Sequence, residues 1–345
     1  MSFKTLTDSE KVENLATTVA EPLWSAVTTG TLTTFYTGST QDSNNGKYYY
    51  DVHGTDDEDT DVEFSISYGH RLGSGSEASS DTGTNPTKAI YSQIRQVMLP
   101  AQTTQFNFNG GGSGSYESDD IFVISVTRAR YREKMDPGNW ELHLVSGSTT
   151  IKLIDDSGAN TNPAASSAKR EFNVVSGSVA NGVYEVATTT ATATNSGSYG
   201  LFYPESGMII LNPNALQSGS GYDNSRGVIE APTKSASTNN YDHRKLLYSI
   251  QSGSYFSARR EEQKRSSMYF CSARAHEFNH SQNPSFVTGS NYELVKTQFV
   301  QEPITYITTV GLYNDNNELL AVAKLSKPFK KDTNTEALIK VRLDY

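Results

Sequence analysis

The sequence predicts a mainly β protein of the α+β kind, with a multi-stranded β-rich domain, an N-terminal helical arm and a few short helices. Short segments of β-branched and aromatic residues recur along the 345-residue chain, which has 20 Tyr and 14 Phe. Clusters of Gly, Pro, Asn and Asp separate these segments, as turns separate strands. Helical spacing of apolar residues is confined to three short segments.

Residues 1–28 are predicted to form the helical arm. Thr7 and Glu10 have the spacing of a capping box, in which each side chain satisfies a backbone donor at the helix start. The apolar residues that follow recur at helical spacing as far as Pro22: Val12, Leu15, Ala16, Val19 and Ala20. This stripe, with Trp24 beside it, packs either on its own domain or on a neighbouring subunit.

Residues 29–118 are predicted to form a β-rich segment with Gly/Ser loops and one helix at 86–99. Asn85 is a natural N-cap, Pro86 fits the first helical position, and Pro100 ends the segment. Two strands are expected earlier, at Lys47–Val52 and Val62–Tyr68. The acidic run Asp56–Asp61 between them has the oxygen ligands that calcium prefers, but it lacks EF-hand spacing. A solvated loop is the favoured interpretation, and cation binding stays open.

Residues 119–345 are predicted to form the main β-rich domain, interrupted by a helix at about Asp242–Ser252. The stretch Arg259–Arg265 is mixed in charge and is expected to be a solvated turn or helix end. The segment Asp136–Asn139 is expected to be a turn. The predicted strands are Ile121–Arg130, Trp140–Val145, Thr149–Ile154, Gly182–Ala187, Tyr199–Tyr203, Met208–Leu211, Ser267–Ala273, Tyr292–Val300, Thr305–Leu312, Leu319–Lys324 and Ala337–Leu343.

Composition excludes several classes of function. With 29 Lys and Arg against 38 Asp and Glu, the chain has a formal net charge of −9, which gives it no electrostatic reason to seek nucleic acid or an anionic membrane. Its single cysteine, Cys271, excludes an intramolecular disulfide and a CxxC site. The N-terminus lacks secretory-signal features, and no apolar run is long enough to span a bilayer. We therefore expect a soluble protein made in a reducing compartment, and no cofactor.

The segment from His276 to His280 matches the H-E-x-x-H pattern of zinc metalloproteases. On a helix this spacing puts His276 and His280 on one face to hold zinc, with Glu277 as the general base. The flanking residues do not favour a helix, because a β-prone aromatic segment precedes the motif and Pro284 follows it. These three residues are therefore weak metal candidates, and a zinc metalloprotease is the least favoured alternative function.

Other candidate sites are weaker. Cys271 lies in an apolar, strand-like segment, which favours a buried, inert thiol over a nucleophile. Trp24 and Trp140 are the aromatic residues most suited to stacking on sugars, although packing in a core is the more common role. No catalytic residue is assigned, and the protein is not expected to be an enzyme.

The C-terminal region carries the most specific pattern. Glu302–Tyr313 leads through the turn residues Asn314–Asn317 into Glu318–Pro328, which predicts a β-hairpin. The segment "ITTVGLYNDNNELLAVAKLSKP" resembles a hairpin of tail-fibre and baseplate proteins of tailed bacteriophages. Two further stretches resemble virion structural proteins of large contractile-tailed phages, especially cyanophages: Phe64–Ser76 leading to Pro86–Gln93, and Glu277–Phe286. In such proteins an aromatic residue is expected where His280 stands, so the zinc motif would be accidental.

The resemblance implies a structural subunit of a contractile tail, most simply a baseplate component or an adaptor that joins neighbouring tail proteins. Its partners would be other virion tail proteins and further copies of itself in a symmetric assembly, and it would be located in the virion tail after assembly in the host cytoplasm. The main alternative is a glycan-binding host-recognition module. The expected interface residues lie in the arm and in the C-terminal hairpin: Leu15, Val19, Trp24, Tyr306, Leu312 and Tyr313.

Overall fold

The structure is a computed structural model, and the chain divides into two compact units. Unit 1 comprises Met1–Thr18 and Gln263–Tyr345, and unit 2 comprises Val19–Glu262. The predicted boundaries at residues 28 and 118 differ from this division, because unit 1 combines the two ends of the chain. The described residues are 4–38, 48–56, 60–75, 85–109, 115–158, 171–180, 183–186, 197–218, 227–233 and 241–344.

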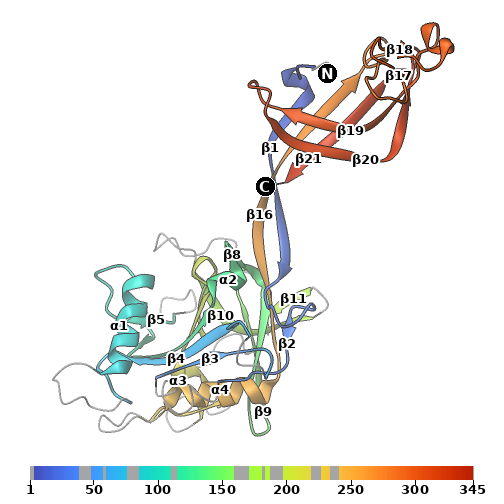
Figure 1. Ribbon diagram of the computed structural model, residues 1–345. Helices are drawn as coiled ribbons and strands as arrows, with labels where there is room; N and C mark the ends of the chain where they lie inside the picture. Colours follow the sequence, from blue (N-terminus) through green and yellow to red (C-terminus); the bar gives the residue numbers. More distant parts are fainter. Residues whose placement is uncertain are drawn as a thin grey trace. The chain divides into compact units, whose positions relative to one another are not determined.

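Unit 2 is built on an antiparallel sheet with the strand order β8-β9-β10-β12-β13-β7-β4-β3, which confirms the predicted mainly β fold (Figure 1). The first part of β16 pairs with the outer edge of β8. These strands are β3 (Tyr49–Val52), β4 (Phe64–His70), β7 (Asp120–Val126), β8 (Lys134–Ser146), β9 (Thr149–Asp155), β10 (Phe172–Ala180), β12 (Gly200–Tyr203), β13 (Met208–Leu211) and β16 (Phe256–Ala273). Short strands complete the unit: β2 (Thr31–Leu32), β5 (Phe106–Asn107), β6 (Glu117–Ser118), β11 (Val183–Val186), β14 (Gln217–Ser218) and β15 (Ile229–Glu230).

One segment near the N-terminus of unit 2 covers both ends of this sheet. Leu32 in β2 pairs with Phe256 in β16 at one end. A few residues later, Tyr36 and His53 exchange backbone hydrogen bonds of 2.9 and 2.8 Å beside β3 at the other end. An uncovered sheet edge is a template for pairing with other chains, and these contacts cover part of each edge.

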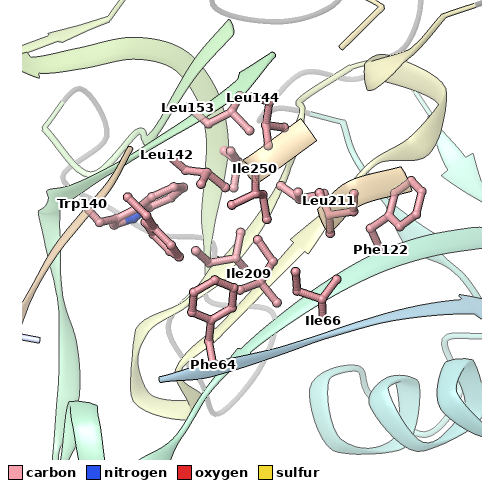
Figure 2. Close-up of a cluster of buried hydrophobic side chains, with 14 of the residues drawn as sticks. Phe64, Ile66, Phe122, Trp140, Leu142, Leu144, Leu153, Ile209, Leu211 and Ile250 are labelled. Atoms are coloured by element: carbon pink, nitrogen blue, oxygen red, sulfur yellow. The ribbon is translucent and has the colours of Figure 1, made fainter. Parts of the chain in front are cut away.

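Helices cover both faces of the sheet in unit 2. The larger core packs Ile250 of α4 against sheet residues such as Trp140 and Ile209 (Figure 2). The second core packs Tyr91 and Ile94 of α1 on the opposite face. The helices are α1 (Pro86–Met98), α2 (Arg128–Tyr131), α3 (Pro213–Leu216) and α4 (Asp242–Gly253), and a 3-10 turn, η3, spans Pro204–Ser206. The helices predicted at 86–99 and 242–252 are thus confirmed.

Unit 1 consists of long strands and a small irregular lobe. The second part of β16 pairs with β21: Ser266 lies opposite Asp344 at one end of the pairing, and Ala273 lies opposite Ala337 at the other. Strand β1 is also a neighbour of β16 in the sheet. Strands β19 and β20 form the predicted C-terminal hairpin (Figure 1). The elements of unit 1 are η1 (Asp8–Glu10), β17 (Val287–Thr288), β18 (Glu293–Leu294), η4 (Thr297–Val300), β19 (Thr305–Tyr313), β20 (Leu319–Lys331) and β21 (Ala337–Asp344). Two strands belong to both units: β16, as above, and β1 (Lys11–Pro22), which passes into unit 2 at Val19.

The predicted N-terminal helical arm is wrong. Thr7 and Glu10 do close a turn, with the Thr7 N–H donating to the Glu10 carboxylate at 3.0 Å, but the turn is the three-residue η1. The chain then continues as the strand β1 through Pro22. Pairing with the 18-residue strand β16 overrides the weak helical periodicity, as tertiary context commonly does.

Three other local predictions are also corrected. Arg259–Arg265 lies inside β16, where the Arg260 guanidinium pairs with Glu21 at 2.6 Å and with Glu262 at 2.6 Å. Asp136–Asn139 lies inside β8, at a register shift against β16. The predicted strand Tyr292–Val300 is instead β18 followed by the 3-10 turn η4.

Candidate interaction surface

The H-E-x-x-H segment forms a turn in unit 1, so the helix that this motif requires is not present. His276 and His280 are both exposed, and Phe278 between them has φ +56°, outside helical geometry. Among the described residues, no group of three His, Cys, Asp or Glu side chains is placed to hold a metal. The geometry therefore weighs against the metalloprotease alternative.

The turn is held by a buried lysine that sequence reasoning missed. Lys331, at the end of β20, is fully buried, and its ammonium donates to the backbone oxygen of Ala275 at 2.8 Å and to Asn279 Oδ1 at 2.9 Å. It also donates to the backbone oxygen of Asp332 at 2.8 Å. A buried charge is tolerated when its donors are satisfied in this way. Nothing in the sequence around Lys331 signals burial, because neighbouring lysines of β20 are exposed.

Glu277 ties the same turn to the N-terminal segment of unit 1. Its carboxylate accepts the Arg274 N–H at 2.8 Å and pairs with the Lys4 ammonium at 2.9 Å. These bonds, the backbone one first, lower the pKa of Glu277. Nearby, the hydroxyl of Ser272 donates to Glu10 at 2.6 Å, and this bond with those from Thr7 lowers the pKa of Glu10 to about 2. A lowered pKa makes Glu277 a weak base, which suits a structural role.

Both tryptophans are core residues of unit 2. Trp24 is buried, and its indole N–H donates to the backbone oxygen of Phe256 at 2.9 Å. Trp140 is also buried and packs against Phe202. Neither ring is available to stack on a glycan, and Trp24 is not a surface residue of this chain. The other predicted interface residues of the arm do not define an exposed surface. Val19 is half-buried, and the side chain of Leu15 lies outside the described part of the chain.

Two other candidates are placed by the structure. Cys271 is half-buried in β16, and burial raises the pKa of its thiol, as expected for an unreactive cysteine.

In the acidic run, residues 57–59 lie outside the described residues. Asp61 is exposed and pairs with Arg130 at 2.6 Å, so this carboxylate is already neutralised by a cation of the protein.

The hairpin β19–β20 presents an exposed apolar face that includes one of the predicted interface residues, Tyr313. Tyr313 pairs with Leu319 across the strands, and Gly311 pairs with Val322. A Cβ at Gly311 would lie 2.9 Å from the Tyr313 ring and 3.3 Å from Leu319, so both side chains cover this glycine on one face. Tyr306, at the base of the hairpin, is 62% exposed. Large apolar side chains in such an arrangement are typical of interaction sites.

The opposite face of the hairpin is better covered. Leu312 pairs with Ala321 and Val310 with Ala323, and all four side chains are half-buried. The predicted interface residue Leu312 therefore lies on the inner face, while Tyr306 and Tyr313 are exposed. Exposed apolar residues that the prediction omitted include Leu319, Leu320 and Val322 in β20 and Leu338 in β21. The two-residue alternation of β20 could have found Val322, whereas the joint exposure of the adjacent Leu319 and Leu320 goes with the register shift beside Tyr313, which has no sequence signal.

We define the outer hairpin face as Gly311, Tyr313, Leu319, Leu320 and Val322. The outer hairpin face is therefore the largest group of exposed apolar side chains that the described part of the hairpin presents on one side.

Comparison of the chain with protein families, curated proteins and solved structures finds no match. In the described part of the chain, no helix is long and apolar enough to cross a membrane.

Proposed function

We propose that the protein is a structural subunit of a phage contractile tail, acting as a baseplate component or as an adaptor between neighbouring tail proteins. The observation that carries the proposal is the outer hairpin face, where Leu320 and Val322 are 68% and 59% exposed. Apolar side chains of this size are stabilised when a partner removes them from water, by about 25 cal/mol for each Å² buried. The same segment carries the resemblance to tail-fibre and baseplate hairpins.

The proposed mechanism is mechanical. Unit 2, with its two-sided core, provides a rigid body, and unit 1 provides the surface that holds neighbouring tail proteins in register. Contacts made by an exposed face can be released and rearranged when a tail contracts, without unfolding the core. The protein would be located in the virion tail after assembly in the host cytoplasm. The buried positions of Trp24 and Trp140 leave the glycan-binding alternative without its two best aromatic residues.

Localisation in the particle tests this proposal directly. Purified particles of the phage that encodes the chain are incubated with a gold-labelled antibody against a tag at the C-terminus and imaged by electron microscopy. The proposal predicts label at one position on the tail in intact particles. Particles that lack the protein, or label on the capsid only, would contradict it.

A further inference from the structure

The charges along the hairpin follow an ordered pattern around the outer hairpin face. Asp315 and Glu318 lie at the tip, the apolar residues lie in the middle, and Lys324 and Lys327 lie toward the base. All four charged side chains are exposed. In the sequence, Glu318 and Lys324 lie three positions on either side of Ala321, and Asp315 and Lys327 lie six positions on either side. Lys324 shares the face of Val322, because the two residues pair with Thr309 and Gly311, whereas Lys327 lies in a register shift of the hairpin.

These charges are not neutralised by any ion pair within the part of the chain that the structure describes. Within the described residues, none of the four takes part in an ion pair, although Glu318 accepts a hydrogen bond from the Asn314 side chain at 2.7 Å. By contrast, the adjacent Lys330 lies 3.5 Å from Asp332. The hairpin thus presents an exposed acidic end and an exposed basic end, which are available for ion pairs with another molecule.

We propose that the outer hairpin face binds a second copy of this chain, with the two hairpins packed face to face and antiparallel around a two-fold axis near Leu320 and Val322. In a two-fold interface, residue i of one copy meets residue j of the other, and j meets i. The antiparallel arrangement places Asp315 and Glu318 of each copy against Lys327 and Lys324 of the other. The apolar residues are buried together at the centre. The inference rests on the proposed function, because it names the partner of the same face.

The charge balance of the two units favours this surface for self-association. Unit 1 has 12 Lys and Arg against 11 Asp and Glu, a net charge of +1, whereas unit 2 has 17 against 27, a net charge of −10. Two copies that meet through unit 2 repel each other strongly, and two that meet through unit 1 do not. A foreign protein would need to match this acidic-apolar-basic order by chance, and a second copy matches it by symmetry.

Charge reversal tests the proposal with its own internal control. The variants are Lys324→Glu/Lys327→Glu and Asp315→Lys/Glu318→Lys, compared with the full-length wild type by sedimentation velocity over a range of concentrations. Each variant alone places like charges in contact, so we expect its dimer dissociation constant to rise at least about tenfold. An equimolar mixture restores opposite charges, so we expect a mixed dimer of about wild-type affinity. Circular dichroism establishes that each variant is folded.

Net charge alone predicts a different result. Asp315→Lys/Glu318→Lys changes the chain from −9 to −5, which would strengthen self-association if overall repulsion controlled it. The control Lys88→Glu, at an exposed position of α1 in unit 2, adds negative charge outside the hairpin and should leave dimerisation unchanged. A wild type that remains monomeric at about 100 µM, or a mixture that stays monomeric, would overturn the inference. Tail localisation in the same virus would still support the proposed function, so the two failures are distinguishable.

Discussion

The two units differ in how they bury apolar residues and how they treat strand edges. Unit 2 packs aromatic and aliphatic side chains on both faces of its sheet, and the segment from Leu32 to Tyr36 pairs at both ends of that sheet. Unit 1 has few buried hydrophobic residues among those described: Ala273, Phe286, Val287, Ala337 and Val341. It nevertheless contains most of the exposed large apolar side chains, although it is the smaller unit.

This contrast indicates a division of labour between the units. A core with two packed faces supplies enough buried area to fold without assistance. A unit with a small core and an exposed apolar face gains stability when another surface covers that face. Unit 2 is therefore expected to be stable in isolation from partners, whereas the stability of unit 1 should depend on assembly. The predictions below test this difference, beginning with the largest expected effect.

The largest effect is expected in the core of unit 2. Trp140→Ala removes a buried ring that packs against Phe202, and the resulting cavity should lower the free energy of unfolding by about 3–5 kcal/mol. The control is Trp140→Phe, which keeps a ring and removes an indole N–H that has no hydrogen-bond partner among the described residues. Its cost should stay below about 1.5 kcal/mol in denaturant unfolding. Equal losses of stability in both variants would show that packing of the ring is not the main contribution of Trp140 to the free energy of unfolding.

In unit 1, the largest effect is expected at a polar residue. Lys331→Met leaves the oxygens of Ala275 and Asn279 without their ammonium donor, which should lower stability by about 2–3 kcal/mol. The adjacent, exposed Lys330 provides a matched control, because Lys330→Met should change stability by no more than about 0.5 kcal/mol. Hydrogen exchange of residues 274–280 measures the effect locally. Unchanged exchange in the Lys331 variant would contradict the claim that this lysine stabilises the turn.

A smaller, pH-dependent effect is expected at Asp242, the first residue of α4. Its Oδ1 accepts the Thr233 N–H at 2.8 Å and lies 3.0 Å from the Lys245 ammonium, whereas Oδ2 is buried and has no hydrogen-bond partner among the described residues. Burial raises the pKa of Asp242, and the nearby Asp120 adds to this. The stability contributed by the neutral form is therefore complete below the unfolded pKa of about 3.9 and is lost as the pH rises toward the folded pKa.

Asp242→Asn should remove this pH dependence. We expect the variant to gain stability relative to the wild type as the pH rises from 4 to 7, as measured by thermal unfolding at both values. The neutral amide keeps an oxygen for the Thr233 N–H and does not need to ionise inside the unit. A difference between variant and wild type that is the same at both pH values would contradict the assignment.

The smallest effect on stability is expected on the outer hairpin face. Val322→Thr changes an exposed side chain opposite Gly311 and should alter the free energy of unfolding of the dilute protein by no more than about 0.5 kcal/mol. The same change should weaken self-association, because it places a hydroxyl at the centre of the proposed interface. Sedimentation and chemical unfolding of one sample measure both quantities. A large loss of stability in the dilute protein would mean that Val322 belongs to the core of unit 1.

Local signals in the sequence were sufficient for several elements. The helix α1 was predicted because Asn85 and Pro86 mark its start and its apolar residues repeat at helical spacing. The hairpin β19–β20 was predicted because a polar Asn/Asp turn separates two apolar segments. In each of these cases the information lies within about 30 consecutive residues.

Elements that depend on distant residues were not predicted. The first segment of the chain has apolar residues at helical spacing, yet it forms β1 because it lies beside β16, more than 230 residues away in the sequence. Unit 1 combines both ends of the chain for the same reason, because its strands pair with segments that are distant in the sequence. Burial of Lys331 depends on oxygens of residues 275 and 279, which only the folded chain brings to its ammonium. The interface predicted on the hairpin stays a prediction: its Tyr306 and Tyr313 are exposed, whereas the inner-face position of Leu312 follows from strand register.

Hydrogen exchange of the full chain at low and high protein concentration tests the central contrast most directly. We predict that amides of Leu319–Lys324 in β20 are protected at high concentration and lose that protection on dilution, because a second copy covers the outer hairpin face. Amides of Ile121–Val126 in β7, within the core of unit 2, should exchange equally slowly at both concentrations. Hairpin exchange that is independent of concentration would contradict the account.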